Sequence, residues 1–378
     1  MKILFIFQGY TASPDKFDNG LWKEILKCDV GDILFKNGKR LFETHKESMH
    51  NFFKNFSKTH LSSVVYNKRT LIPLKDYSDN IILYNKNKVK NISNYDVIII
   101  DCTWAYYDYI SYLRKKYPDK IIIGIQDESI QEIQFCDTHM KVSIYGGLHS
   151  LDCYICYNRQ TFSWVKPCVK NTIYLYHPIT TELIKRISKK IDKKDKRKIA
   201  LGISNWNYDF SNVFTNFLIF KKLNESCQNK LYGEMVGIRE YRKEEVSLFQ
   251  SIDNAIEIVG WLSEEYYSRL STYNFLIQMP TRAVAGRVSA ECAILGTPVI
   301  GNENCDMQKY CWPDLSVEEF DVKTAVSLGK RLIEDRQFYD RVVWKAKRKI
   351  VRLAEETTTY KEKIINITET IKKARRVT

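Results

Sequence analysis

The chain has 378 residues, which is enough for two domains, and 44% of them are hydrophobic, which excludes wholesale disorder. No run approaches the roughly 18 uncharged apolar residues that a membrane-spanning helix needs, and the apolar start is too short for a signal peptide, so we expect a cytoplasmic protein. The formal charge of +14 favours a polyanionic partner, such as DNA or an anionic membrane to which the protein binds peripherally, although a lysine-rich solvated surface explains it equally well.

The first half of the chain alternates short apolar runs with helical patterns, as βαβ units do. This pattern predicts strands and helices that form a parallel sheet. The predicted strands are Ile3–Phe7, 30–35, 97–100, 120–125, Cys153–Cys156 and 172–176, and the predicted helices are 20–26, 40–58 and 106–116.

The second half restarts after the charged segment 189–198, which is the best candidate for a linker. The same alternation follows and predicts a second parallel sheet. The predicted strands are 199–203, 231–236, 256–262, 275–278 and 297–301, and the predicted helices are 213–223, 264–271, 325–332 and a long charged helix from about Asp335 onward. Two such sheets predict a ligand cleft between domains.

The ten cysteines are scattered through apolar or strand-like surroundings, as reduced cytosolic cysteines are. Cys153 and Cys156 have CxxC spacing, but alternation along a strand predicts that their thiols lie on opposite faces. Since the sequence has no second CxxC, we expect no metal site.

The most informative stretch runs from Thr281 to Gly301 and reads TRAVAGRVSAECAILGTPVIG. It predicts a loop, a helix that ends at Gly296, and a buried strand. Gly286 lets the backbone approach a ligand, the free N–H groups at a helix start attract phosphate, and Glu291 lies one turn into that helix. The layout is typical of a nucleotide site at the carboxyl edge of a parallel sheet, and an ordinary crossover with a packing glycine is the alternative.

These residues also carry a family resemblance. The run VGWLSEE at 259–265 is followed by Leu270, by a strand into Pro280, and by ECAILGTPVI at 291–300. The pattern resembles the C-terminal domain of GT-B glycosyltransferases, most closely the large retaining family (family 4, glycosyl transferases group 1) that includes sucrose synthases and mannosyltransferases. The match covers about the last half of the chain, and the first half agrees in strand–helix order.

The resemblance implies a donor site for a nucleotide-sugar. Glu291 takes the position that grips the ribose hydroxyls, and a carboxylate there makes short, strong hydrogen bonds. Gly286, Arg287 and Val288 take positions near the diphosphate, and Trp261, after Gly260, lies where the base stacks, although a core tryptophan is equally expected. The loops at Gly9 and Gly202 complete the donor-binding set implied by the resemblance.

Two departures from the family pattern stand out. Ala283 occupies a position that is usually acidic, and the loop 202–209 lacks the usual basic pair. Because a diphosphate leaving group develops negative charge, other cations must stabilise it. Arg282 and Arg287 are the natural substitutes, with Arg287 in a catalytic role, and the pair at 239 and 242 is a weaker one. These departures leave both a retaining and an inverting mechanism open.

An inverting transferase needs a general base near the acceptor hydroxyl. Asp101 and Asp127 each follow a buried strand of the first half, and Glu128 beside Asp127 would raise its pKa. Helix capping is the alternative for both aspartates. His149 is another candidate base, although a lone loop histidine is more often incidental. The tyrosines at 106, 107 and 109 either line an acceptor site or belong to the core.

The resemblance therefore predicts an α/β protein of two Rossmann-like domains facing across a cleft. The expected parts are an acceptor domain at 1–185, a linker at 186–198, a nucleotide-sugar domain at 199–350, and a helix at 351–378 that packs back on the first domain. We expect a hexosyl- or pentosyltransferase that uses a UDP-sugar, no tightly bound cofactor and no metal. The acceptor is a glycan, a lipid-linked glycan or a hydroxymethylated DNA base, and the alternatives are an inactive nucleotide- or glycan-binding module and, more weakly, a nucleic-acid-binding protein without catalysis.

Overall fold

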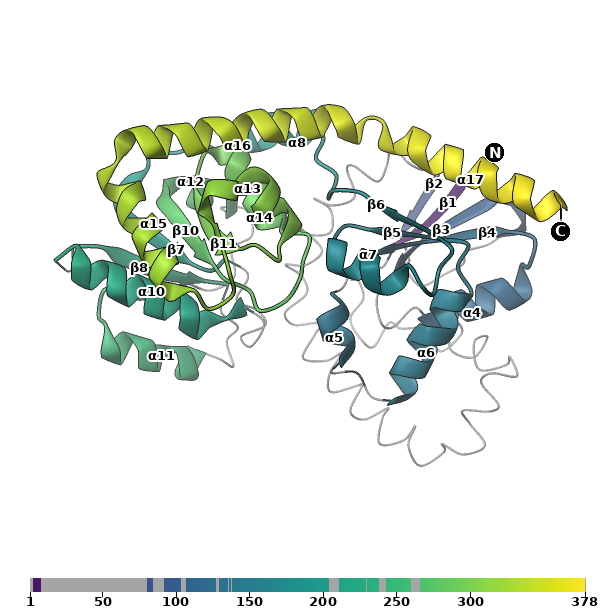
Figure 1. Ribbon diagram of the computed structural model, residues 1–378, viewed down its shortest axis with the longest axis horizontal. Helices are drawn as coiled ribbons and strands as arrows, with labels where there is room; N and C mark the ends of the chain where they lie inside the picture. Colours follow the sequence, from purple (N-terminus) through teal and green to yellow (C-terminus); the bar gives the residue numbers. More distant parts are fainter. Residues whose placement is uncertain are drawn as a thin grey trace. The chain divides into compact units, whose positions relative to one another are not determined.

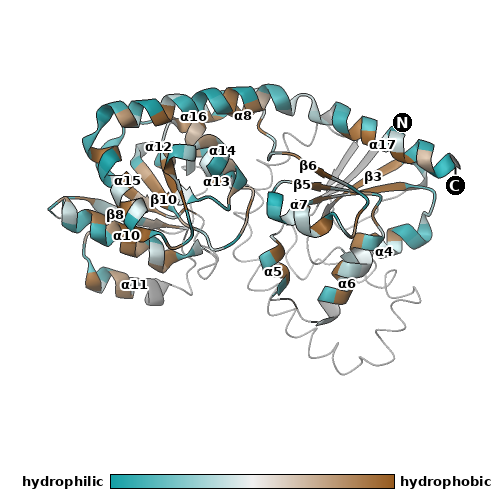
Figure 2. Cartoon of the chain, viewed as in Figure 1, coloured by the Kyte–Doolittle hydropathy of each residue, from teal (hydrophilic) through white to brown (hydrophobic). Residues whose placement is uncertain are grey.

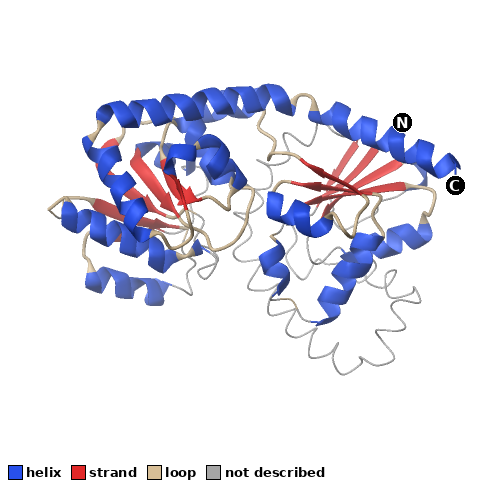
Figure 3. Cartoon of the chain, viewed as in Figure 1, coloured by secondary structure: helices blue, strands red, loops and turns tan. Residues whose placement is uncertain are grey.

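The structure is a computed structural model that describes residues 3–7, 80–83, 92–102, 107–126, 129–134, 136, 138–203, 211–228, 230–237, 243–259 and 266–377. The chain divides into two compact units. Unit 1 comprises Met1–Cys156, Gln160–Tyr174 and Tyr360–Thr378, and unit 2 comprises Tyr157–Arg159 and Leu175–Thr359. Each unit is an α/β body with its own sheet (Figure 3).

The sheet of unit 1 is parallel throughout its described strands, in the order β2-β1-β3-β4-β5-β6. Its strands are β1 (Ile3–Phe7), β2 (Asn80–Leu83), β3 (Val97–Cys102), β4 (Ile121–Gln126), β5 (Cys153–Cys156) and β6 (Asn171–Tyr174). Its described helices are the 3-10 helix η3 (Ile92–Asn94), α4 (Tyr107–Lys116), α5 (Ile130–Gln134), α6 (Thr138–His149), α7 (Arg159–Val165) and α17 (Tyr360–Val377) (Figure 1).

The sheet of unit 2 is also parallel, in the order β12-β11-β10-β7-β8-β9. Its strands are β7 (Asp195–Leu201), β8 (Tyr232–Val236), β9 (Ile256–Val259), β10 (Tyr273–Gln278), β11 (Val299–Asn302) and β12 (Ser316–Val317). Its described helices are α8 (Thr181–Ser188), α10 (Val213–Ser226), α11 (Lys243–Ile252), α12 (Tyr266–Thr272), α13 (Arg287–Leu295), α14 (Asp306–Cys311), the 3-10 helix η6 (Pro313–Leu315), α15 (Val322–Glu334) and α16 (Arg336–Thr357).

The strand order of unit 2 reverses between β7 and β10. From β7 the chain proceeds outward through β8 to β9, and then returns to place β10 on the other side of β7. Because parallel crossovers are right-handed, the helices of the two halves lie on opposite faces of the sheet. Figure 1 accordingly shows α10 and α13 on opposite sides of β10. Ligands of open α/β sheets bind at the carboxyl ends of strands beside such a reversal, so the β7–β10 edge is where a site is expected.

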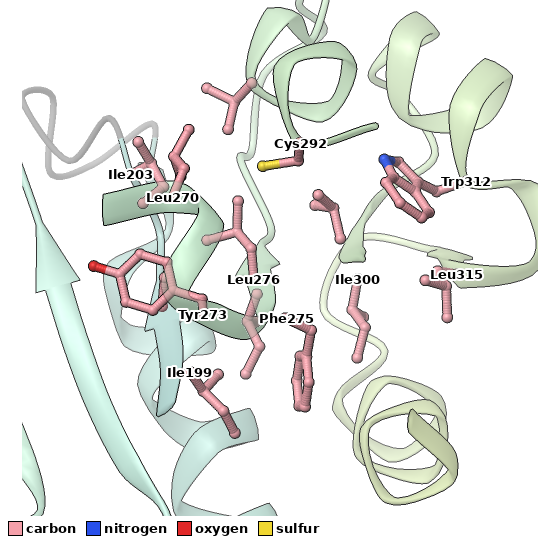
Figure 4. Packing of buried hydrophobic residues seen from close by; sticks show 14 of the residues in the cluster. Ile199, Ile203, Leu270, Tyr273, Phe275, Leu276, Cys292, Ile300, Trp312 and Leu315 are labelled. Atoms are coloured by element: carbon pink, nitrogen blue, oxygen red, sulfur yellow. The ribbon is translucent and has the colours of Figure 1, made fainter. Parts of the chain in front are cut away.

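The core of unit 2 is built from apolar side chains of the central strands and of the helices that cover them. Ile199, Phe275, Leu276 and Ile300 are fully buried from three neighbouring strands, and Figure 4 shows them packed together. These strands are buried on both faces, and therefore read as nearly continuous apolar runs rather than as an alternation. The outer surfaces of the covering helices are mainly hydrophilic (Figure 2).

Two boundaries differ from the predicted ones. β7 begins at Asp195, inside the charged segment that we expected to be a linker. Its first residues are exposed but already belong to the sheet, because Asp195 lies opposite Tyr273 of β10, and Lys198 pairs with Glu234 of β8. The long helix expected from Asp335 onward is two helices, α16 and α17, separated at Thr358 and Thr359. Threonine has a low helix propensity, and the threonine run at 357–359 explains the break.

Candidate functional site

The candidate site of unit 2 lies at the carboxyl ends of β7 and β10. The backbone N–H of Gly202, directly after β7, donates to the Ile277 carbonyl of β10 at 2.8 Å. The backbone N–H of Ile203 then donates to Oε1 of Gln278, the last residue of β10, at 3.0 Å. Gly202 has φ of 76°, in the left-handed region that favours glycine. The two loops that the sequence predicts to carry a ligand therefore start side by side.

The loop from Met279 to Gly286 follows β10 and is held from outside by side-chain amides. Asn302 Nδ2 donates to the Pro280 carbonyl at 2.8 Å, and Asn158 Nδ2 donates to the carbonyls of Val284 and Asn304 at 3.3 Å each. Both asparagine side chains are fully buried. The loop is thus fixed before a ligand arrives, which is the condition for a preorganised binding site.

Gly286 sets the start of α13. Its φ is 78°, and a Cβ added there would lie 3.2 Å from Cys305 Cβ and 3.4 Å from Met307 Cβ. A side chain at this position would therefore meet both backbone strain and a tight contact. Gly286, the residue before α13, has no side chain that could cap the helix, and the Ser289 N–H donates to the Gly286 carbonyl at 3.0 Å. The positive end of the helix dipole therefore faces the loop.

Glu291 lies in the second turn of α13 and is 1% exposed. Its Oε2 accepts a hydrogen bond from the hydroxyl of Tyr266 at 2.7 Å, and its Oε1 accepts one from the hydroxyl of Tyr267 at 3.2 Å. Both tyrosines belong to α12, on the segment that precedes β10. A carboxylate has about four lone-pair sites, so the two tyrosines leave acceptor capacity for further hydroxyl groups.

Arg287 begins α13 and completes this cluster. Its guanidinium Nε lies 3.9 Å from Glu291 Oε1, and its side chain is 13% exposed. The imidazole of His177 is buried nearby, and its ring centroid lies 5.4 Å from that of Tyr157. Burial, and next the positive charge of Arg287, lower the pKa of His177 to about 3. The cluster therefore contains one cation, one carboxylate and a neutral imidazole.

The remaining candidates in unit 2 lie around the same loop. Val288 is buried on the first turn of α13, and Arg282 is half-buried in the loop. Ala283 is 1% exposed, so the position that carries an acid in the resembling family faces the protein interior here. Burial raises the pKa of the nearby Cys305 thiol to about 12, and the charge of Arg282 opposes that rise.

In unit 1, Asp101 is the fifth residue of β3, close to its carboxyl end and beside β1, where the strand order of this sheet reverses. His149 is the last residue of α6 and is exposed, with its ring against Tyr145. We expected a loop histidine, but it ends a helix that leads into the amino end of β5, away from the carboxyl edge that carries Asp101. Tyr107 belongs to the core, where its hydroxyl lies 3.4 Å from that of Tyr154.

Several predicted residues lie outside the described residues. They are Gly9, Tyr106, Asp127, Glu128, Arg239, Arg242, Gly260 and Trp261. The side chains of Asp101 and Tyr109 are likewise outside the description, although their backbones are in β3 and α4. Their assignments stay predictions.

Cys153 and Cys156 are both buried free thiols of β5. Burial raises the pKa of Cys153 to about 12 and that of Cys156 further still, so neither thiol ionises readily. The searched part of the chain, which is its described residues, contains no group of three or more histidine, cysteine or acidic residues placed to hold a metal. Across the same residues, no helix is long and apolar enough to cross a membrane.

Four residues of the cluster were not singled out from the sequence. Tyr266 and Tyr267 have a local signal, since adjacent tyrosines follow the Glu264-Glu265 pair where a helix is predicted. Asn158, which holds the loop, and His177, which lies near Arg287, have none, because they come from segments more than 100 residues earlier in the chain. Only the folded chain brings them to α13.

Comparison with solved structures places this fold among known ones. HepE of Anabaena in complex with UDP aligns over the whole of both chains with a TM-score of 0.56 and 13% identity. Trehalose-6-phosphate synthase of Burkholderia multivorans aligns over 74% of this chain and 72% of its own, with a TM-score of 0.60 and 9% identity. TarM aligns over 72% of this chain with a TM-score of 0.58 and 10% identity, and the alignment spans 54% of TarM.

No protein-family model matches the chain, and no curated protein matches it in sequence. At the identities above, the structural likeness establishes the fold. The predicted GT-B architecture, with two parallel α/β sheets, is confirmed.

Proposed function

We propose that this chain is a glycosyltransferase that takes its sugar from a nucleotide-sugar, with UDP as the nucleotide. The observation that carries the proposal is the fixed loop at 279–286, which leads through Gly286 into the start of α13 beside the strand reversal of unit 2. This arrangement presents the positive end of a helix dipole to a diphosphate. It is supported by HepE, which has the same fold and was solved in complex with UDP and with UDP and glucose.

In this proposal Glu291 binds the ribose hydroxyls through the acceptor capacity that its tyrosines leave free. Because Glu291 is 1% exposed, the hydroxyls reach it only if the groups that cover it move. Arg287 and Arg282, at the two ends of the glycine loop, stabilise the negative charge that develops on the diphosphate as the sugar leaves. Gly9, Gly202, Trp261 and Val288 complete the proposed donor site.

The acceptor is assigned to unit 1. For an inverting reaction, Asp101 or Asp127 takes the proton from the acceptor hydroxyl as that oxygen attacks the anomeric carbon of the sugar. The bond from this carbon to the diphosphate oxygen breaks in the same step, and UDP leaves with the bonding electron pair. The acceptor is a hydroxyl of a glycan, of a lipid-linked glycan or of a hydroxymethylated base in DNA, and the transferred group is a hexose or a pentose. The basic composition, with a formal charge of +14, supports an acceptor held on a polyanionic surface.

Titration of the full-length protein with UDP tests the donor site. Glu291→Gln keeps the volume of the side chain but removes its charge, so we expect UDP to bind at least tenfold more weakly, which corresponds to about 1.4 kcal/mol. Glu303→Gln is the matched control, because Glu303 pairs only peripherally with Lys309 and should leave UDP binding unchanged. If the wild-type protein binds none of the UDP-, GDP- and ADP-sugars, the proposal is wrong.

A second candidate is a module that binds a nucleotide or a glycan without transferring sugar. Ala283 in place of the usual acid favours it, because one of the two expected carboxylates of the donor site is absent. The two candidates are separated by incubating the protein with UDP-glucose and measuring UDP release. Release that Glu291→Gln abolishes identifies an enzyme, whereas tight binding without release identifies the module.

A further inference from the structure

The outer face of α16 carries a charge pattern that the proposed donor site does not use. From Arg341 to Ala354 the sequence is RVVWKAKRKIVRLA, with six basic residues and no acidic one. The inner face of this stretch is buried in the core of unit 2 through Val342, Ala346 and Ile350. The outer face is exposed, and Figure 2 shows it as largely hydrophilic.

Four cations of this stretch are exposed, namely Arg341, Lys347, Arg348 and Arg352. The other two have partners in unit 2: Lys345 forms an ion pair with Asp314, and Lys349 donates a hydrogen bond to the Tyr310 carbonyl. Among the residues that the structure describes, none of the four exposed cations forms an ion pair with a carboxylate. Their positive charge is therefore not neutralised within the described fold.

Two apolar side chains lie within this basic face. Trp344 is 57% exposed and Val351 is 51% exposed, and Arg348 lies between them with its guanidinium 4.6 Å from the Trp344 ring. The spacing from 341 through 344 and 348 to 351 follows the three- and four-residue intervals that align side chains on one side of a helix. We call the six residues Arg341, Trp344, Lys347, Arg348, Val351 and Arg352 the basic face of α16.

We propose that the basic face of α16 binds an anionic lipid surface. Basic side chains beside a membrane are attracted to acidic headgroups, and a tryptophan with an apolar body and a polar N–H settles at the boundary between headgroups and acyl chains. The rigid helix lies flat, since its inner face is fixed in the core, so Trp344 and Val351 enter the headgroup layer together.

The two apolar side chains favour a lipid over a nucleic acid as the partner. A DNA backbone would neutralise the four cations but would offer no apolar environment to Trp344 and Val351, whereas a bilayer accommodates both groups at once. With only two apolar side chains, the attachment is shallow, reversible and sensitive to salt, because screening at physiological ionic strength acts over about 8 Å. The inference is independent of the proposed donor site.

Sedimentation of the full-length protein with vesicles tests the proposal. The vesicles are pure phosphatidylcholine or phosphatidylcholine with about one third phosphatidylglycerol, at low and at physiological salt. We expect binding to the anionic vesicles only, and at least a tenfold loss in the triple variant Lys347→Gln, Arg348→Gln, Arg352→Gln. Trp344→Ala should weaken binding severalfold without any change in charge. All of these side chains are exposed, and thermal unfolding confirms that the variants fold.

The matched control is Lys196→Gln, Lys222→Gln, Lys230→Gln, which removes the same charge from exposed positions on β7, on α10 and before β8. We expect it to retain most of the binding. Equal loss in both triple variants would show a general charge effect and overturn the proposal. Equal binding to neutral and anionic vesicles, or no binding to either, would also overturn the proposal. The same holds if the basic face is required for binding to duplex DNA but not for binding to vesicles. UDP titration of the same variants should be unaffected, which separates this test from that of the donor site.

Discussion

His177 is a titratable side chain in an environment that disfavours its charged form. It is buried, and Arg287, the residue beside the glycine of the candidate phosphate loop, adds a repelling positive charge. The neutral imidazole can accept or donate a hydrogen bond without bringing a second cation into the cluster. We therefore interpret His177 as a neutral neighbour that adds no second positive charge beside Arg287.

The stability of the protein should depend on the ionisation of His177. Its pKa is about 3 in the folded chain and about 6.5 in the unfolded chain, so between these values the unfolded state binds more protons. Stability is then fully present above about pH 6.5 and is lost as the pH falls toward 3, by at most ~1.4 kcal/mol for each pH unit.

His177→Gln removes this titration, and we expect a shallower loss of unfolding free energy between pH 7 and 4, measured by urea denaturation. At pH 8 the imidazole is neutral in both states, so the comparison there gives the pH-independent effect of the substitution. Identical pH slopes for the two proteins would contradict the assignment.

At the residue scale, the sequence predicts features that depend on local backbone conformation, such as the glycine at which a helix ends. The predicted helix end at Gly296 is confirmed, with φ of 71° at that glycine. Gly286, which we singled out for close approach of the backbone to a ligand, has φ of 78°. Asn158 and His177 were not predicted, because their importance comes from contacts made across distant segments. The candidate roles of Glu291 and Arg287 stay predictions, although the structure brings these two side chains together.

At the scale of elements, α12 and α13 are joined through a buried carboxylate. Tyr266 and Tyr267 of α12 both donate to Glu291 of α13, and a buried carboxylate that loses a donor keeps its desolvation cost. We expect Tyr266→Phe to lower the free energy of unfolding by about 1 to 3 kcal/mol, and Tyr267→Phe by less, because its hydrogen bond is longer. If Glu291 also binds ribose, both variants should weaken UDP binding.

Urea denaturation and UDP titration measure the two effects. Tyr339→Phe is the matched control, since its buried hydroxyl donates to the Asn274 carbonyl at 2.9 Å, away from Glu291. It should change stability without changing UDP affinity. A double-mutant cycle between Tyr266→Phe and Glu291→Gln should show a coupling energy, and strict additivity would mean that the hydrogen bond contributes nothing.

The order of strands and helices in unit 2 was predictable because periodicity and glycine signals repeat along it. The boundaries at β7 and at the α16–α17 break were not. Charged residues normally mark loops, yet Lys198 remains in β7 because Glu234 of β8 balances its charge. The break at Thr358 depends on the low helix propensity of threonine, which is a weak signal in the sequence. It also depends on a distant contact, because the Thr357 hydroxyl accepts a hydrogen bond from the Ile179 N–H at 3.2 Å.

At the scale of the whole molecule, unit 1 is built from both ends of the chain. Its sheet comes from the first half of the sequence, whereas α17 comes from the last residues. Asp152 is the junction, because its carboxylate accepts from both Arg114 of α4 and Arg375 of α17, and from the Ile122 N–H at 2.8 Å. Arg375 also donates to the carbonyls of Pro118, Asp119 and Lys120 at 3.2 to 3.3 Å. Unit 1 is therefore complete only when the last helix has been made.

We expect Arg375→Ala to loosen unit 1 in particular. The substitution removes a charge-assisted contact with Asp152 and leaves three carbonyls without this donor, which should cost about 1 to 2 kcal/mol, a range that allows for partial exposure of the pair. Lys373→Ala, at an exposed position of the same helix, is the matched control and should cost little. Hydrogen exchange gives the local measurement, because β4 begins directly after Lys120 and should lose protection while β10 of unit 2 keeps it. Equal loss of protection in β4 and β10 would show that Arg375 acts on the whole chain, and unchanged protection in β4 would show that α17 is held by its apolar contacts alone.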